Sequence, residues 1–354
     1  MTATADAAVE RLDPELLADI GAHASALDRG EETSRRSFTR LGAAGLLGLG
    51  APGNTDGRLP QMAEVIGRIS GACMSTGFSV WANRVVLEYL LMAATPFSLA
   101  AARSLLAGTT LGVTGMASAF KEAAGCGSLD LTAATVDGGY LLSGSIRWAS
   151  NLYPDSTMVT AARTDAGERL IVALRLDTPG VVLGDHFDLL ALGSTASSYL
   201  TLENAYVGSE QVLSNDFGAF LQTVRPTFLV LQSAMCLGLT RTTVEQSRLG
   251  LTGVNAVFTA EVDAIADKLD AAQATLAELA GAVGAAKSPA KQELLSLRLV
   301  AAELASASAD LEIRTAGGKG YASRTSASRR YREAAFIPVQ SPSEAQLRWE
   351  LERC

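Results

Sequence analysis

The fold of this chain is decided by the run Asp137-Gly138-Gly139-Tyr140-Leu141-Leu142-Ser143-Gly144-Ser145-Ile146-Arg147-Trp148-Ala149-Ser150-Asn151. Asp-Gly-Gly predicts a hairpin turn, because glycine tolerates the positive φ that such turns require. The strand that follows ends in an aromatic residue, Trp148, and a hydroxyl, Ser150, stands two residues further on. The run lies inside the stretch 111–213, a long block rich in β-type residues that is flanked by helical sequence on both sides.

Short β-type runs recur through this central block. They lie at 129–133, 140–142, 158–161, 170–174 and 199–202. Turn signals separate them, such as Asp165-Ala166-Gly167 and Pro179-Gly180. Even spacing of this kind predicts an antiparallel sandwich or barrel.

Helical patterns fill the sequence before the block. Asp13-Pro14-Glu15 is a typical helix start, with an Asp cap and Pro at the first helical position. Long apolar helices are predicted at 61–76, 79–94 and 97–106. Residues 1–110 are therefore expected to form a helical N-terminal domain, followed by a β-domain at 111–215.

Helical sequence returns near Asp216, and one long helix is predicted at 225–249. From Phe258 to Val283 the apolar residues alternate at spacings of four and three, which is a seam of coiled-coil type. Ser288-Pro289 opens a further helix. We expect residues 216–354 to form a helical bundle, and the seam favours a homodimer or homotetramer.

Composition excludes several classes of function. A net charge of -8 argues against a nucleic-acid partner, because phosphate binding relies on clustered Lys and Arg. Four cysteines show no CxxC and no zinc spacing, and two histidines make a His-based triad or a multi-His metal site improbable. The cysteines are expected to be incidental thiols of a reducing compartment, so a cytoplasmic protein without a metal is predicted.

The segment Ser34–Arg40 has two interpretations, as a targeting signal or as part of the fold. With the apolar run 41–52 behind it, the segment looks like a twin-arginine export signal. More than thirty residues precede it, and no small-residue cleavage site follows cleanly. We therefore expect an amphipathic helix followed by a Gly- and Pro-rich loop, and the apolar run is too short to span a membrane.

The order helices, β-block, helical bundle, taken with the motifs of the chain, resembles the acyl-CoA dehydrogenase superfamily. The resemblance covers nearly the whole chain and is strongest at 138–213 and 317–346. It rests on the Gly-Gly turn, on the Trp148-Ala149-Ser150-Asn151 run and on Gly317-Gly318-Lys319-Gly320-Tyr321. The resemblance implies an α+β multidomain fold: an N-terminal helical domain, a middle antiparallel β-domain and a C-terminal four-helix-type bundle, with FAD in the cleft between the last two.

The resemblance also implies roles for single residues. Trp148 would pack against the isoalloxazine ring, because a flat apolar ring favours an aromatic wall, and Ser150 would hydrogen-bond near N5. Thr114 would bond the pyrimidine edge of the flavin. The glycine-rich motif, with Gly317, Gly318 and Gly320, would lie against the adenine and phosphate end of an FAD held by the neighbouring subunit.

Several positions depart from the family pattern. The family's Arg-x-x-Phe-Gly motif, which grips the FAD pyrophosphate, keeps Phe258 but has Asn255 in place of the Arg. Another cation must then neutralise the phosphates, and Arg314 and Lys319 are the candidates. The acidic and Gly-Ser-Asp parts that usually follow Thr114 are absent, as is the Arg that often follows Leu-Gly in the β-domain.

The catalytic base is the most consequential departure. If Ser343-Glu344-Ala345-Gln346 is matched to the family, Gln340 stands where the family has its C-terminal Glu; a shift of one residue puts Ser341 there. Neither side chain can take an α-proton near neutral pH.

Three functions stay open on these residues. The first is FAD-dependent α,β-dehydrogenation of an acyl thioester, bound to CoA or to an acyl carrier protein, with hydride transfer to flavin N5 and electrons passed to an acceptor. The second is a flavin-dependent monooxygenase or oxidase on the same fold. The third is a non-catalytic or cofactor-free family member that acts as a binding partner.

Overall fold

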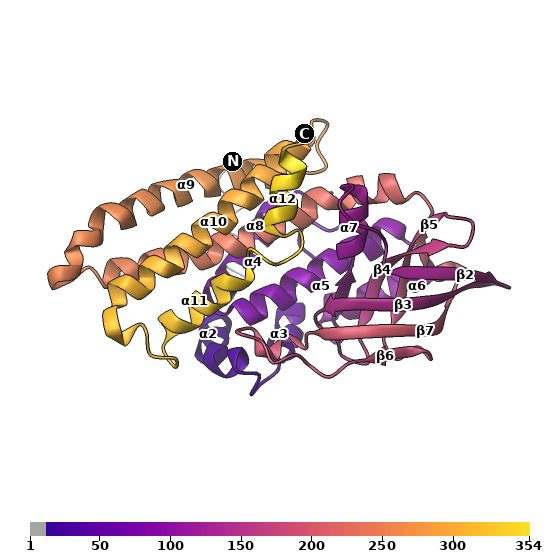
Figure 1. The fold of residues 1–354 in the computed structure, drawn as a ribbon, viewed down its shortest axis with the longest axis horizontal. Helices are drawn as coiled ribbons and strands as arrows, with labels where there is room; N and C mark the ends of the chain where they lie inside the picture. The colour runs from indigo at the N-terminus through magenta and orange to yellow at the C-terminus, as the bar shows by residue number, and fades with distance from the viewer. Residues whose placement is uncertain (1–11) are drawn as a thin grey trace.

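The structure is a computed structural model in which residues 12–354 are described. Helices occupy one side of the molecule and a twisted sheet the other (Figure 1). The N-terminal part consists of α2 (Pro14–Asp28), η1 (Ser34–Ser37), α3 (Phe38–Ala43), α4 (Leu59–Ala72), α5 (Met74–Ala93) and α6 (Pro96–Ala107). The helix start at Asp13 is confirmed, since the Asp13 carboxylate accepts the Glu15 N–H at 2.9 Å.

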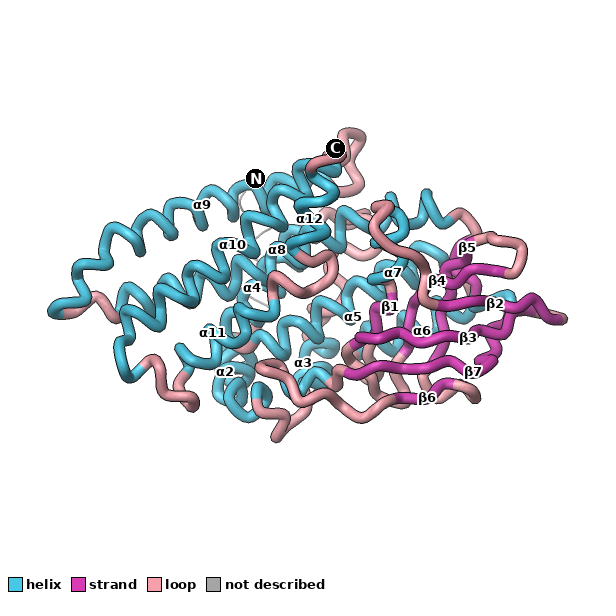
Figure 2. Tube along the Cα trace, viewed as in Figure 1, coloured by secondary structure: helices cyan, strands magenta, loops and turns pink. Residues whose placement is uncertain are grey.

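The strands fall between residues 112 and 214 (Figure 2). They are β1 (Gly112–Gly115), β2 (Leu131–Val136), β3 (Gly139–Ala149), β4 (Thr157–Thr164), β5 (Arg169–Arg175), β6 (Val181–Leu183), β7 (Ser198–Gly208) and β8 (Val212–Ser214). Three helical turns interrupt them: α7 (Ala117–Ala123), η2 (Gly193–Thr195) and η3 (Ser209–Gln211).

The strands form one sheet in the order β6-β7-β3-β2-β4-β5-β8, with β1 also beside β4. The hairpin between β2 and β3 is confirmed, with Val136 opposite Gly139 and Gly138 at a φ of 76°. The expectation of purely antiparallel pairing is wrong, because β1 and β2 both run parallel to β4 along one of its edges. Each of these parallel pairs is joined by a long crossover that contains other strands, and periodicity within a strand does not specify its partner.

The C-terminal part comprises α8 (Phe217–Leu249), η4 (Gly253–Phe258), α9 (Thr259–Ala282), α10 (Lys291–Ala316), η5 (Gly317–Lys319), α11 (Ser326–Phe336) and α12 (Glu344–Leu351). Helix α8 begins earlier than predicted because the Asp216 carboxylate caps it through the Ala219 N–H at 2.9 Å, and it continues through Pro226.

One apolar core runs through the helices of both terminal parts, while the sheet has a second, smaller core. Helices α4 and α8 cross closely at two glycines: a side chain on Gly238 would collide with the carbonyl oxygen of Gly67. The two helical parts therefore share one interior.

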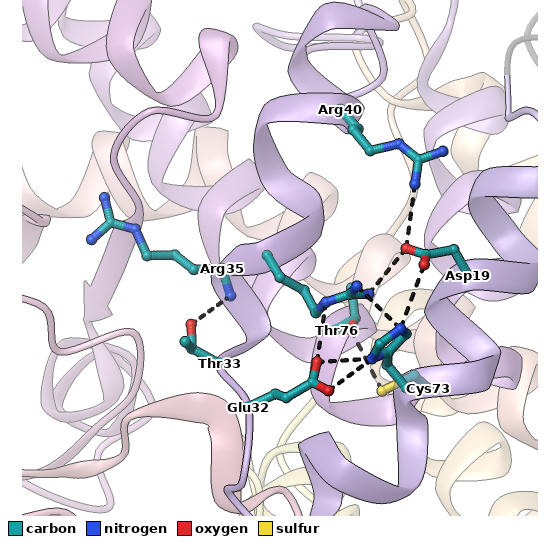
Figure 3. Close-up of polar contacts among 9 residues, drawn as sticks. Asp19, Glu32, Thr33, Arg35, Arg40, Cys73 and Thr76 are labelled. Atoms are coloured by element: carbon teal, nitrogen blue, oxygen red, sulfur yellow. Dashed lines mark hydrogen bonds and ion pairs between the residues drawn. The ribbon is translucent and has the colours of Figure 1, made fainter.

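The arginine-rich segment before residue 41 is folded into the N-terminal part. Ser34 and Ser37 are buried. Arg35 pairs with Asp155 at 2.6 Å. Figure 3 shows Arg40, which reaches Asp19 at 3.3 Å. The segment forms η1 and the short helix α3, and no helix among residues 12–354 is long and apolar enough to cross a membrane.

Candidate active site

A cavity of about 360 Å³ opens where the N-terminal helices, the sheet and the C-terminal bundle meet. Its lining comes from five places in the chain: from α5, Phe78, Trp81 and Ala82; from β1 and α7, Thr114, Ala117, Phe120 and Lys121; from the end of β3, Trp148, Ala149 and Ser150; from α8, Phe228; and from α11 and the segment behind it, Phe336, Val339, Gln340 and Ser341. We call it the central cavity.

Aromatic rings form most of the walls of the central cavity. Phe78 stacks on Trp81, with ring centroids 5.6 Å apart, and meets the edge of Phe336 at 5.0 Å. Phe228 meets Trp81 at 5.0 Å and Phe120 at 4.9 Å. Rings from four helices thus contact one another in an unbroken series, which makes a rigid, apolar enclosure.

Trp148 is the exposed aromatic residue of the site. Its side chain is 51% exposed, although it ends a strand whose neighbouring Ala149 is buried. It lines the central cavity and also a smaller one of about 210 Å³ on the side of residues 189–192. Phe187 lies against it with centroids 4.6 Å apart. A tryptophan so placed offers ring surface to a flat ligand.

Gln340 and Ser341 bring unpaired polar atoms to the central cavity. Gln340 is buried, and among the described residues neither its amide oxygen nor its amide nitrogen has a hydrogen-bond partner. The Ser341 hydroxyl is unpartnered in the same way, while its carbonyl accepts the Gln232 amide at 3.1 Å. Buried polar groups are normally satisfied, so these atoms are available for a ligand.

No carboxylate appears among the described lining residues, where Lys121 is the single ionisable side chain. Two buried carboxyls lie nearby in the chain but line no described cavity. Glu88 pairs with Arg84 at 2.7 Å. Glu333 pairs with Arg329 at 2.8 Å, and burial raises the pKa of Glu333. The cavity consequently has no evident general base of its own.

A second cavity of about 410 Å³ shares Phe120 with the central one. Arg169, Arg225 and Lys291 line it together with apolar residues of α8 and α10. Their carboxylate partners are Glu122 and Glu350, so cations outnumber acids around it.

The remaining predicted cofactor residues lie elsewhere, at the end of the bundle where α8 leads into α9 and α10 ends (Figure 1). The Asn255 amide donates to the Thr315 carbonyl at 2.8 Å. Arg314 forms a two-point ion pair with Glu261, at 2.8 and 3.1 Å, and its guanidinium lies 4.6 Å from the Phe258 ring centre. We call this region the bundle end.

The turn at the bundle end is open. Gly317, at a φ of 63°, and Gly318 have no atom within 4 Å of where a side chain would begin. Gly320 is packed against the last turn of α10. The structure thus brings together Thr114, Trp148, Ser150, Gln340 and Ser341, and separates them from the bundle-end group.

Sequence reasoning missed several residues of the site. Phe78, Phe336 and Phe187 were not singled out, because isolated aromatic residues in apolar helices and loops carry no distinguishing pattern. Thr195 and Ser197 join the Ser150 hydroxyl across the sheet end. The Leu-Gly-Ser-Thr motif at 192–195 was the available signal for them.

No protein-family model matches the chain. A probable acyl-CoA dehydrogenase of Bacillus subtilis is 24% identical over 93% of this chain and 92% of its own length. The structure of butyryl-CoA dehydrogenase from Megasphaera elsdenii superposes with a TM-score of 0.86 at 16% identity, covering 98% of this chain and 97% of that one. These similarities in sequence and fold confirm the predicted resemblance to the acyl-CoA dehydrogenase superfamily. A prolyl acyl carrier protein oxidase also shares the fold, with a TM-score of 0.79 at 18% identity over 96% and 97% of the two chains.

FAD is the cofactor of this superfamily, and the central cavity can be tested for it. The exposed face of Trp148 supplies the aromatic wall that a flavin ring needs, and the buried hydroxyl of Ser150 stands at its side. The unpaired atoms of Gln340 and Ser341 supply hydrogen-bonding capacity. These residues fit the ring end of FAD. Among the described residues that line the central cavity, Lys121 is the only cation that could neutralise the pyrophosphate.

Proposed function

We propose that this chain is an FAD-dependent oxidoreductase that dehydrogenates an acyl thioester between its α and β carbons. The observation that supports the proposal most is the half-exposed Trp148 beside Ser150 in an aromatic cavity at the junction of sheet and bundle. FAD, when bound there, would supply the two-electron chemistry by accepting the hydride from the β carbon, and the α-proton would pass to a base outside the described lining of the central cavity. Catalysis by this fold then depends on how the chain holds both reactants.

Trp148 would hold the ring face, and Thr114 with Ser150 would fix its polar edge. The wall formed by Phe78, Trp81 and Phe336 would exclude water and take the apolar acyl group. A small or aromatic acyl chain would pack against these rings better than a polar one.

The second cavity supports a thioester with an anionic arm. It adjoins the central cavity at Phe120, and its surplus of cations would attract a phosphate at the far end of the arm. CoA and the prosthetic group of an acyl carrier protein both have this chemistry, so both substrates belong to the proposal.

The spectrum of the purified protein tests this function. A flavin absorbance should accompany the protein, and an acyl thioester added under anaerobic conditions should bleach it without another reductant. A panel that pairs each acyl group on CoA with the same group on a carrier protein identifies the preferred carrier. A colourless protein that does not take up FAD would contradict the proposal.

The absence of a described carboxylate in the cavity favours a second candidate, a flavin-dependent monooxygenase or oxidase. Neither Gln340 nor Ser341 can remove an α-proton at neutral pH, whereas both can hydrogen-bond a polar substrate. If thioesters fail to bleach the flavin, if an external reductant does reduce it, and if the reduced protein then consumes O₂ in a substrate-dependent way, the second candidate is correct.

The bundle end supports a homo-oligomer as the working form. Arg314 and the glycine turn are not among the lining residues of the central cavity of their own chain, so they would serve a cofactor held by a partner. Sedimentation of the FAD-loaded protein tests this, and a loaded monomer would contradict it.

A further inference from the structure

Three hydroxyls and a carbonyl form a chain of hydrogen bonds that starts at the central cavity. Ser150 Oγ lies 2.6 Å from Ser197 Oγ, which lies 2.8 Å from Thr195 Oγ1. Thr195 Oγ1 lies 2.8 Å from the carbonyl oxygen of Leu192. All three hydroxyl-bearing residues are buried. We call the set the hydroxyl relay.

The direction of the hydroxyl relay follows from its last member. A carbonyl oxygen has no hydrogen, so at 2.8 Å the Thr195 hydrogen must point to Leu192. Since a hydroxyl has a single hydrogen, Ser197 must donate to Thr195, and Ser150 must then donate to Ser197. Ser150 therefore presents only lone pairs to the cavity. Because the relay ends on a carbonyl, it orients Ser150 and cannot conduct a proton away.

The backbone around the hydroxyl relay adopts strained conformations. Leu192 and Ala196 have φ values of 63° and 45°, and Asn151 has 61°. Residues other than glycine avoid this region, and such conformations persist where the surroundings over-determine them. Here the backbone N–H of Asn151 donates to the Thr195 carbonyl at 2.8 Å. The side-chain amide of Asn151 donates to the carbonyl oxygens of Ser79 and Gly112. Such outliers concentrate at functional sites.

We propose that the hydroxyl relay makes Ser150 a fixed hydrogen-bond acceptor that selects the reduced cofactor; the inference rests on the proposed FAD site. A ring that lies on Trp148 would have Ser150 near its edge, because both residues line the central cavity at the end of β3. Two-electron reduction converts an acceptor nitrogen in the central flavin ring into an N–H donor. An acceptor-only oxygen bonds the N–H and repels the lone pair of the oxidised ring.

Ser197 and Thr195 are thus positioning residues, which act through Ser150. If Ser197 becomes Ala, the Ser150 hydrogen has no partner and can turn to the oxidised ring. If Thr195 becomes Val, the Ser197 hydrogen is released and can point to Ser150, with the same consequence. Ser194 provides a matched control, because it is buried in the same segment and its hydroxyl has no partner among the described residues.

The experiment measures the two-electron reduction potential of bound FAD and the dissociation constants of oxidised and reduced FAD. We expect Ser197→Ala and Thr195→Val to shift the ratio of the two constants roughly tenfold toward oxidised FAD, which lowers the potential by about 30 mV. Ser194→Ala should leave the potential unchanged. Two variants are used so that a failure of one to fold leaves the other.

Unchanged or raised potentials in both variants, with FAD still bound, would overturn the hydroxyl relay and leave the proposed function standing. A wild-type protein that binds no FAD would overturn both. Equal shifts in Ser194→Ala would assign the effect to the segment rather than to the relay, and would also reject the inference.

Discussion

The central cavity and the bundle end were predicted from one resemblance, yet they differ in how complete they are. At the central cavity, residues from distant parts of the chain converge on an enclosed aromatic space with unpaired polar atoms. At the bundle end, Arg314 is already paired with Glu261, and the glycine turn faces open space. In the proposed FAD site, one chain would supply the ring end and leave the phosphate end to be completed by a partner.

The surface of the bundle end agrees with this difference. Val254, Val257 and Tyr321 are 85%, 76% and 84% exposed. Apolar side chains grouped in this way are typical of a surface that another molecule covers. In the proposed homo-oligomer, a second copy of the chain would cover this surface, and the phosphate end of the FAD site would lie between the two copies.

The largest expected effect comes from a base placed in the central cavity. Gln340→Glu should raise the rate at which an acyl thioester bleaches the flavin by roughly a hundredfold, since a positioned general base contributes that much or more. Stopped-flow absorbance measures the rate. Ser341→Glu is the matched variant and decides which residue occupies the base position. No gain from either would count against α,β-dehydrogenation and favour the monooxygenase or oxidase.

The second largest effect is expected when the aromatic side chain of Trp148 is removed. Trp148→Ala removes the ring surface offered to FAD, and burial of a large aromatic side chain is worth about 2 kcal/mol, so affinity should fall roughly thirtyfold. Fluorescence titration with FAD measures it. Trp349→Ala serves as the control, because Trp349 lines none of the described cavities. Equal affinities in wild type and Trp148→Ala would mean that the ring binds elsewhere.

A smaller effect, on stability, is expected from the ion pairs that hold Glu350 of α12 beside the second cavity. Glu350 is buried and meets Arg225 at 2.5 Å and Lys291 at 3.0 Å. Burial alone would raise the pKa of Glu350, but the bonds from Arg225, Lys291 and Gln346 lower it below its usual value. A lowered pKa stabilises the fold above the unfolded-state pKa, and this stability is lost as the pH falls through the folded-state pKa.

Glu350→Gln should therefore cost roughly 1 to 3 kcal/mol of unfolding free energy at neutral pH and progressively less toward pH 3. Urea titrations at a series of pH values measure the difference. Glu352→Gln, on the exposed end of the same segment, is the control. A difference that does not change with pH would contradict the assignment of the ion pairs.

The smallest effect is expected at the bundle end. Asn255→Arg restores a cation where the family grips pyrophosphate, and FAD affinity should rise by about tenfold or less, because a charged hydrogen bond is worth roughly 1.5 kcal/mol. Asn255→Gln controls for length. The gain should vanish at protein concentrations where the chain is monomeric; a gain that persists in monomers would place the phosphate end of the site within one chain.

Much of the fold could be predicted because its signals are local. Asp13-Pro14 and Asp216 start helices through caps within a few residues, and the Gly138 turn fixes the β2–β3 hairpin. The parallel pairing of β1 and β2 with β4 could not be predicted, because strand partners are chosen by contacts across the chain.

The site could be predicted only where a motif carried it. Trp148 and Ser150 came from a contiguous run, and Gln340 from its distance to a downstream motif. The hydroxyl relay joins residues 47 apart in sequence, and its direction depends on a carbonyl. Hydrogen-bond direction is a property of three-dimensional distances, so no residue pattern could have specified it.

The shared interior of the two helical parts determines when this protein can fold. The apolar faces of α4 and α5 are covered only after α8 has been synthesised, because α8 packs against both. At ordinary rates of translation, the interval between the end of α4 and the end of α8 is roughly 10 to 35 seconds. During that time the nascent chain carries an uncovered apolar surface, a natural target for chaperones at the ribosome.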